Sequence, residues 1–587
     1  MARRRAIRIF FLFVVVGISL GVIALAGVWL AVGGAPAVPE NATLILRVGG
    51  TLVEMPPADV IGQFAGRGRA ETIRSYVDTL RKAKADDRIS SVLIVPTGLD
   101  LPYWAKVQEL RDAILDFRKS GKRAVAYLEH GGDREYYLAT ACDRVFLVPT
   151  SSLDVTGIAS YEVFLRGTLD KIGAYPDFSR IGEYKTAPNQ LTERTFTPAH
   201  REMREWLNRD MYEQLVRGIA EGRKKRVEDV KALIDQGPFL ADAALQAGLV
   251  DGLAYEDQLD DRGAVNRDGR TVEGEEYAQV SLRSVGLNQG PRIAVIYIAG
   301  AITSGDSGFD PLNGEVAGSG TLIDTIRTAR ADSSVRAIVV RIDSPGGSTT
   351  ASDVIWRELA ITRDQKPSRP LVASMSDLAA SGGYYVAMAA PQIVAQPGTL
   401  TGSIGIFGGK VVTGGTYEKL GASVEAMSIG RNAQMFSPVR PFNESERAKL
   451  QEQLDAFYRQ FIAKVAAARK MPAAKVDAVA RGRVWTGQQA KQHGLVDELG
   501  GLDRAIALAK QRAGIAADAD VEIVNYPAPK RLIDLLIEQL NGAGATGLAG
   551  LGLLNDGDRR AIGMLTAPMR LFRRGEPLAL MPAAFLR

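Results

Sequence analysis

The chain has 587 residues, of which 46% are hydrophobic and 24% are charged, so it is long enough for roughly three to four domains and is not disordered overall. Its net charge of +5 is small for this length and favours a balanced soluble surface over nucleic-acid binding. The single cysteine, Cys142, excludes an internal disulfide, and three scattered histidines with no glycine-lysine motif for ATP lead us to expect no metal and no cofactor.

An apolar segment near the N-terminus, residues 9–32, predicts a transmembrane anchor. The segment has no charged residue and follows four arginines, and about 20 residues suffice to span a bilayer. Cleaved signal peptides have a shorter apolar region of about 7–15 residues, although APA at residues 35–37 resembles a cleavage site. We favour an uncleaved anchor within residues 1–38, in the inner membrane of a bacterium. The arginines place the N-terminus in the cytoplasm and the following domains on the periplasmic or outer side.

The rest of the chain contains two copies of one domain. EYYLATACDRVFLVP ends at Pro149, and the similar GYYVAMAAPQIVAQP ends at Pro397. DKIGA and EKLGA, at residues 170–174 and 418–422, have the same spacing, and LVDG and LVDE repeat with a drift of two residues. A nearly constant shift through separate landmarks indicates a duplication.

Segments that predict strands alternate with segments that predict helices in both copies. Strands are predicted at residues 43–48, 91–95, 293–298, 337–342, 370–375 and 392–395, and helices at 198–226, 351–362 and 444–470. This alternation predicts a mainly parallel α/β sheet in each copy. The expected units are a first repeat at 39–260, a linker at 261–290, a second repeat at 291–516 and a peripheral C-terminal segment at 517–587.

Three motifs in the second copy place small residues and serines at turns: DSPGGS at residues 343–348, AASGGYY at 379–385 and TLTGSIG at 399–405. Ligands bind at the carboxyl ends of strands in open parallel sheets, and the first motif follows such a strand. Ser381 lies between a predicted strand and helix, where the N–H of Gly382 would point at a developing oxyanion. Each motif also has a plain explanation, as a helix N-cap with packing glycines, a strand-to-helix turn or a loop.

A serine nucleophile needs a base, and the histidines His130, His200 and His493 are a poor source of one. A buried lysine can serve when burial keeps it neutral. Lys185, in RIGEYKTAPN of the first copy, is the candidate, with a solvated surface lysine as the alternative.

The two copies differ at the residues that matter for such a site. By the repeat spacing, Lys185 aligns with Ala433, and Ser381 aligns with Asp133. The glycine pair of the second copy is replaced by PTGLD, residues 96–100, in the first. Each copy lacks what the other has, which predicts one site with a base from the first copy and a nucleophile from the second.

The three motifs, in this order and spacing, resemble the signal peptide peptidase A family of serine endopeptidases. The resemblance covers roughly residues 40–515 and implies a tandem duplication of a Clp-protease/crotonase-like α/β domain with an N-terminal membrane anchor. It implies that Ser381 is the nucleophile, Lys185 the general base and Ser403 the residue that orients the lysine. The N–H groups of Gly347 and Gly382 would form the oxyanion hole.

The resemblance also implies an ATP-independent Ser-Lys endopeptidase that degrades cleaved signal peptides and other apolar extended peptides, assembled as a homo-oligomer, a tetramer in this family. One departure is Ser376-Asp377, where the family usually has a glycine, and we expect the acidic side chain to alter substrate fit. A crotonase-like acyl-thioester enzyme and a non-catalytic membrane scaffold remain alternatives. Whether Lys185 and Ser381 meet within one chain or between neighbours is left open.

Overall fold

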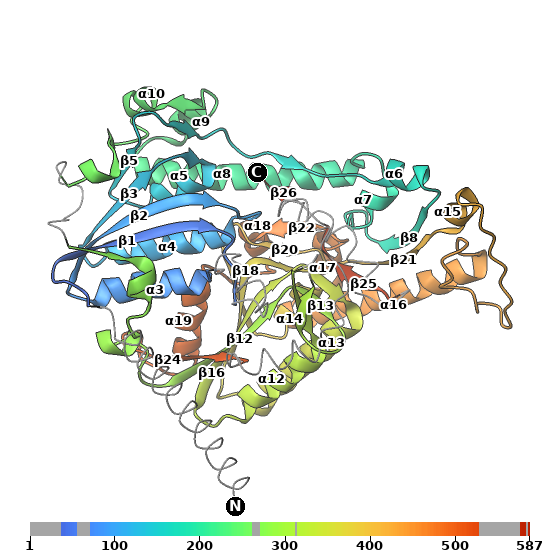
Figure 1. Ribbon diagram of the computed structural model, residues 1–587. Coiled ribbons are helices and arrows are strands. Elements are labelled where there is room, and N and C mark those ends of the chain that lie inside the picture. The colour runs from blue at the N-terminus through green and yellow to red at the C-terminus, as the bar shows by residue number, and fades with distance from the viewer. Residues whose placement is uncertain are drawn as a thin grey trace, which may run out of the picture.

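The computed structural model describes residues 37–55, 71–260, 270–310, 314–527, 576–582 and 585–586. Two α/β units lie side by side, the first in blue and teal and the second in green, yellow and orange (Figure 1). The predicted anchor at residues 9–32 lies outside the described residues. In the part of the chain that the structure describes, no helix has the length and apolar character needed to cross a membrane.

The first repeat contains a six-stranded sheet in which every neighbouring pair is parallel. Its order is β10 (Gly252–Leu253), β5 (Arg144–Leu147), β3 (Arg123–Leu128), β2 (Ile89–Leu99), β1 (Ala42–Gly50) and β11 (Thr271–Glu273). The central strands β1, β2, β3 and β5 are apolar and mostly buried, as expected for parallel strands covered by helices. The main helices of this repeat are α3 (Ile73–Ala85), α4 (Ala105–Arg118), α5 (Asp133–Ala139) and α8 (Pro198–Arg223).

The second repeat has the same strand order. The corresponding strands are β23 (Glu498–Leu499), β19 (Gln392–Ala395), β18 (Leu371–Ala380), β16 (Val335–Ser344), β12 (Arg292–Ala299) and β24 (Glu522–Tyr526), again with parallel neighbours. Two more strands extend this sheet: β20 (Leu400–Gly402) pairs with the carboxyl end of β18, and β22 (Val484–Thr486) pairs with β20. Its main helices are α12 (Ser319–Ala331), α13 (Thr349–Gln365), α14 (Gly382–Ala387), α16 (Glu444–Arg469) and α19 (Leu502–Arg512). The prediction of a duplicated, mainly parallel α/β domain is therefore confirmed.

The long helices α8 and α16 have matching ends. Each has 26 residues, and an N-cap side chain, Thr197 or Asn443, accepts a backbone N–H of the first turn. Each ends at a lysine in the left-handed conformation, Lys224 with φ 51° and Lys470 with φ 52°. The matching left-handed C-cap residues of the two helices are consistent with the duplication.

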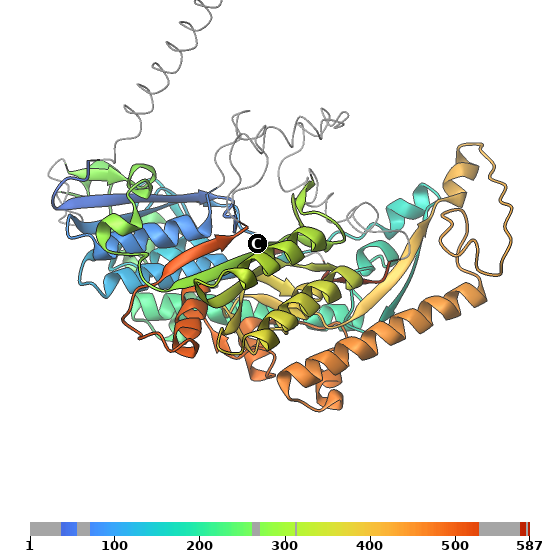
Figure 2. The same ribbon diagram turned by 90° about the horizontal axis from the view of Figure 1, so that it is seen from below.

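The two repeats are joined by an antiparallel ribbon of β8 (Tyr175–Ile181) from the first repeat and β21 (Ile406–Val412) from the second. With α16 and α15 (Gly414–Lys419), this ribbon forms an arm that projects from the two sheets (Figures 1 and 2). The repeats also share a hydrophobic core, because Ala380, Leu400 and Val484 of the second repeat pack in the main cluster of the first. The repeats are therefore one packed body.

Two segments outside the expected repeats also form strands. Residues 271–273 of the expected linker form β11, an edge strand of the first sheet, and α11 (Gly274–Ala278) follows it. In the described part of the C-terminal segment, β24 is an edge strand paired with β12, and β25 (Leu578–Leu580) is buried in a third sheet. Short apolar strands such as these give little signal by themselves, since tertiary pairing decides whether they form.

The third sheet brings together segments from both repeats and the C-terminus. Its order is β14 (Gly308–Asp310), β15 (Gly314–Gly318), β13 (Ala301–Thr303), β17 (Gly346–Ser348), β25, β21 and β8. The strand β17 contains the glycine pair of DSPGGS, and β8 leads into the loop of Lys185. This sheet therefore places the predicted site residues of the two repeats beside each other.

The remaining described elements are short. They are β4 (Gly131–Gly132), β6 (Ser152–Asp154), β7 (Ser160–Tyr161), β9 (Phe239–Leu240), β26 (Phe585–Leu586), α6 (Arg166–Lys171), α7 (Asn189–Thr192), α9 (Val227–Ile234), α10 (Ala241–Gln246), α17 (Ala473–Val479), α18 (Gly487–Gln492) and the 3₁₀ helices η1 (Glu256–Gln258) and η2 (Leu282–Val285). Of these, β26 pairs with β7, so the C-terminal end of the described chain contacts the first repeat.

Candidate active site

Ser381 lies at the carboxyl end of β18, on the single residue that separates this strand from α14. Its backbone has φ 55° and ψ −110°, a conformation that residues with a side chain rarely adopt. The turn is held by the Ser381 N–H, which donates to the carbonyl of Gly402 at 2.7 Å. Strained backbone of this kind concentrates at functional sites, because the surrounding structure must impose it.

Lys185 reaches Ser381 from the first repeat within the same chain. Its Nζ lies 2.7 Å from Ser381 Oγ, 3.0 Å from Ser403 Oγ and 3.0 Å from the Ser403 carbonyl oxygen. All three residues are fully buried. The structure thus brings together the predicted nucleophile, base and orienting serine, and one chain supplies all three.

The environment of Lys185 favours a neutral amine. Burial lowers the pKa of Lys185 well below its ordinary value, and desolvation is the cause. Lys106 is buried nearby with the opposite result: burial by itself would lower its pKa, but the carboxylates of Asp343 and Asp377 outweigh it and raise the pKa above its usual range. Of these two buried lysines, only Lys185 is set up to accept a proton.

Two loops of the second repeat, around Ser403 and Gly482, contact the segment that contains Lys185. A Cβ on Gly482 would lie 2.4 Å from Lys185 Cα, and the Tyr184 N–H donates to the Arg481 carbonyl at 3.0 Å. Ser403, with φ 49°, donates its N–H to the Arg483 carbonyl at 2.7 Å. Gly482 was not among the predicted site residues, since a glycine in a polar loop gives no signal of what packs against it.

The predicted oxyanion donors are also adjacent. A Cβ on Gly382 would lie 3.1 Å from the Gly347 nitrogen, and a Cβ on Gly346 would lie 2.6 Å from the Gly382 nitrogen. Only glycine allows this approach, and Gly346 has φ +98°, in the region that favours glycine. The backbone amides of β17 and of the Ser381 turn therefore lie next to one another.

The C-terminal strand β25 occupies a place that the sequence did not predict. It pairs antiparallel with β17, with Gly347 opposite Ala579 and Ser348 opposite Leu578, and it contacts β21 on its other side. The Met581 N–H donates to the Pro345 carbonyl at 2.8 Å. The chain's own C-terminal segment thus lies extended along the strand that contains Gly347.

Asp377 does not lie where the sequence suggested. Its side chain is buried against the first repeat and accepts the backbone N–H of Lys106 at 3.0 Å. An ion pair to Lys106 Nζ, at 3.3 Å, adds to this contact. We therefore correct the expectation that this acidic side chain alters substrate fit, because it faces the interface between the repeats.

The first repeat has Asp133 at the position equivalent to Ser381. Asp133 accepts N–H groups of Thr156 and Gly157, and burial raises the pKa of Asp133 to about 6. It lines a cavity of about 850 Å³ together with Glu129 and Asp154. The first repeat keeps a hollow at its sheet edge, with an aspartate in the place equivalent to Ser381.

The histidines have other partners. His200 contacts Glu162, His130 lies 3.4 Å from Asp154, and the ring of His493 packs on Trp485. Among the described residues there is also no group of three or more side chains that could hold a metal ion. Lys185 is the basic side chain that contacts Ser381.

Comparison with known proteins gives a consistent result. The model of peptidase family S49 matches residues 116–268 and again residues 363–516. The chain is 38% identical over 458 residues to the serine protease SPPA, chloroplastic, of Arabidopsis thaliana, covering 76% of this chain and 67% of that protein. It is 30% identical over 568 residues to Protease 4 of Salmonella typhi, covering 92% and 88%. It is 29% identical over 518 residues to Protease 4 of Haemophilus influenzae, covering 83% and 81%.

Proposed function

The chain belongs to peptidase family S49, and from this premise we propose that it is a serine endopeptidase in which Ser381 is the nucleophile and Lys185 the general base. The observation that carries the proposal is the 2.7 Å contact between Lys185 Nζ and Ser381 Oγ in a fully buried setting. Family membership disfavours the alternatives of an acyl-thioester enzyme and a non-catalytic scaffold. Replacement of Ser381 and of Lys185 tests the proposal.

The proposed reaction follows from the geometry. Neutral Lys185 takes the proton of Ser381 as Oγ attacks the peptide carbonyl, and the N–H groups of Gly347 and Gly382 stabilise the oxyanion. The ammonium that forms on Lys185 is stabilised by the hydroxyl and carbonyl oxygens of Ser403, each 3.0 Å away. Lys185 then gives its proton to the leaving amine and later takes one from the water that hydrolyses the acyl-enzyme.

The proposed substrates are apolar, extended peptides, including cleaved signal peptides. The segment that lies along β17 supports this class, since Leu578, Ala579 and Leu580 are all buried there. Leu578 and Leu580 pack with Ala301 and Phe407, so this side of the strand is an apolar environment. A peptide that pairs with β17 in the same way would place alternate side chains in that environment.

Because β25 and such a peptide would pair with the same strand, removal of β25 is expected to raise activity. A chain truncated before Glu576 should lower the KM for an apolar peptide by about tenfold, since a competing intramolecular strand no longer fills the place. Steady-state cleavage of a fluorogenic peptide measures the change.

The matched control ends after Pro582 and keeps β25, and its KM should equal that of the full chain. A truncated chain that folds normally but has an unchanged or higher KM would show that substrate binds elsewhere.

We also propose a single-pass anchor at residues 9–32 and a homo-oligomer, a tetramer by family resemblance, on the outer face of the inner membrane. The absence of charge from residues 9–32 supports the anchor, and the exposed side chains of Leu420, Met427 and Ile429 on the arm support subunit contact. The full chain should stay in carbonate-washed membranes, whereas a chain lacking residues 1–38 should be released. Light scattering of the released chain should give about four times the monomer mass, and a monomer would contradict the assembly.

A further inference from the structure

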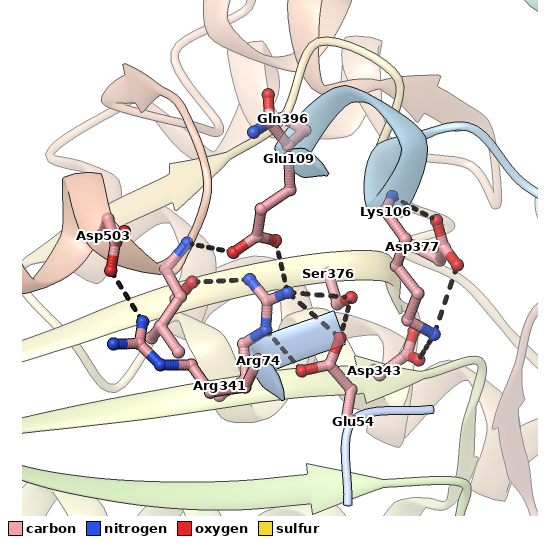
Figure 3. Close-up of polar contacts among 12 residues, drawn as sticks. Glu54, Arg74, Lys106, Glu109, Arg341, Asp343, Ser376, Asp377, Gln396 and Asp503 are labelled. Atoms are coloured by element: carbon pink, nitrogen blue, oxygen red, sulfur yellow. Dashed lines mark hydrogen bonds and ion pairs between the residues drawn. The ribbon is translucent and has the colours of Figure 1, made fainter. Parts of the chain in front are cut away.

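A buried ion-pair cluster joins the first repeat to the second beside the active site. Lys106, in the first turn of α4, places its Nζ 2.7 Å from Asp343 Oδ2 and 3.3 Å from Asp377 Oδ2 (Figure 3). Asp343 lies near the end of β16 and Asp377 near the end of β18. One ammonium of the first repeat therefore bridges the two strands of the second repeat that lead into the catalytic loops.

The two carboxylates are close to the reacting groups in sequence. Asp343 precedes β17 and its glycine pair, and Asp377 is followed after three residues by Ser381. Asp343 also accepts the N–H of Leu378 through Oδ1 at 3.0 Å, so it contacts both strands. A shift of either carboxylate would move a catalytic loop with it.

The backbone between these strands is irregular at this level. Ile342 pairs with Met375, but Ser344 pairs with Ala379, so β18 has extra residues where β16 has one. Such bulges re-aim side chains beside active sites and are stabilised by contacts outside the ladder. Here the contacts are those of Asp377, which lies within the bulge and accepts the Lys106 N–H at 3.0 Å.

A second cation, Arg341, contacts the same two strands at positions that precede Asp343 and Asp377 along the chain. Arg341 bonds Glu54 at 2.8 Å and Glu109 at 2.6 Å from the first repeat, and Ser374 and Ser376 from β18 (Figure 3). This group fixes the strands themselves. The Lys106 group lies further toward their carboxyl ends, where the loops begin.

Loss of the Lys106 ammonium would leave Asp343 and Asp377 without their common cation. Lys106 and Asp377 are 6% and 2% exposed, whereas the side chain of Asp343 is 16% exposed, so water could take the place of the ammonium only on the Asp343 side. Two carboxylates at close range in a buried site repel each other, and they relieve the repulsion by moving apart or by taking up a proton. Either response changes the contacts that hold the bulge.

We propose that Lys106 is a positioning residue for catalysis, which holds Asp343 and Asp377 together and thereby sets Gly347 and Ser381 at their mutual distance. The inference rests on the proposed function. On this proposal the first repeat contributes two residues to the site: Lys185 as the base, and Lys106 as the residue that holds the loops of Ser381 and Gly347 in place.

The test compares Lys106→Met with Lys82→Met in the full chain. Lys82 is another buried lysine of the first repeat, but its Nζ donates only to the backbone carbonyls of Tyr277, Ala278 and Val280, each at 2.9 Å. We expect Lys106→Met to lower kcat about 100-fold with little change in KM, the effect of a misplacement of about 1 Å. Labelling of Ser381 by a fluorophosphonate should slow by a similar factor. Lys82→Met should lower Tm and leave kcat unchanged.

Two more variants separate positioning from folding. Lys106→Arg keeps the charge and should restore most of the activity, and Asp377→Asn, which leaves Lys106 paired with Asp343, should lower kcat about tenfold even if Lys106→Met does not fold. An unchanged kcat in a folded Lys106→Met or in Asp377→Asn overturns the inference, as does an equal loss in Lys82→Met. Full activity in Ser381→Ala would instead reject the proposed function itself.

Discussion

Replacement of Ser381 by alanine is expected to lower the rate of peptide cleavage on the order of 10⁵-fold or more, because it removes the oxygen that attacks the peptide carbonyl in the proposed reaction. The Ser381→Ala chain should fold and assemble as the wild type does, since alanine fits where serine fits. Hydrolysis of a fluorogenic peptide, with Tm as the check on folding, measures the loss.

The duplication offers a matched control for this variant. Asp133 holds the equivalent place in the first repeat, where its carboxylate contacts only local backbone N–H groups among the bonds described above. Asp133→Ala should therefore leave kcat within about twofold of the wild type. Retained cleavage in Ser381→Ala, or an equal loss in Asp133→Ala, would contradict the assignment of Ser381 as the nucleophile.

Replacement of Lys185 by methionine should lower kcat/KM by about 10²–10⁴-fold, the usual contribution of a general base. Wild-type activity should rise with pH as the Lys185 amine loses its proton, with a midpoint well below the ordinary lysine value of 10.5 because burial lowers its pKa. Lys185→Arg should not restore activity, since a guanidinium stays charged. The pH profile of kcat/KM measures the midpoint.

Lys82→Met is the control for the pH profile. Burial lowers the pKa of Lys82 to about 8, but Lys82 bonds backbone carbonyls far from Ser381 in the sequence. Its removal should leave the midpoint in place. If the acid limb of the profile persists in Lys185→Met, another group is the base.

Lys185→Met should raise the stability of the fold although it lowers activity. Between the lowered pKa of folded Lys185 and the ordinary value near 10.5, the unfolded chain binds a proton that the folded chain does not. The free energy of unfolding of the wild type therefore rises with pH across this window. Lys185→Met lacks that penalty and should be more stable than the wild type at neutral pH, with the difference shrinking as pH rises. Urea unfolding at several pH values measures it.

The sequence alone predicted that residues from both repeats would share one site. The repeat spacing aligned Lys185 with Ala433 and Ser381 with Asp133, and this complementary loss predicted that the two copies share one site. The scarcity of histidine then directed the search for a base to lysine. These inferences could be made from the sequence because they depend on residue identity and on a constant shift along the chain, and the structure places Lys185 and Ser381 in contact.

Only the tertiary structure decided what holds the site and what covers it. Asp377 looked like a departure beside the nucleophile, yet its partner is Lys106, far away along the chain, and β25 pairs with β17 across a similarly long separation. A charged side chain or a short apolar segment has the same sequence signature whether it faces solvent, substrate or another repeat. The difference lies in burial and in strand pairing, which are set by the packing of the whole chain.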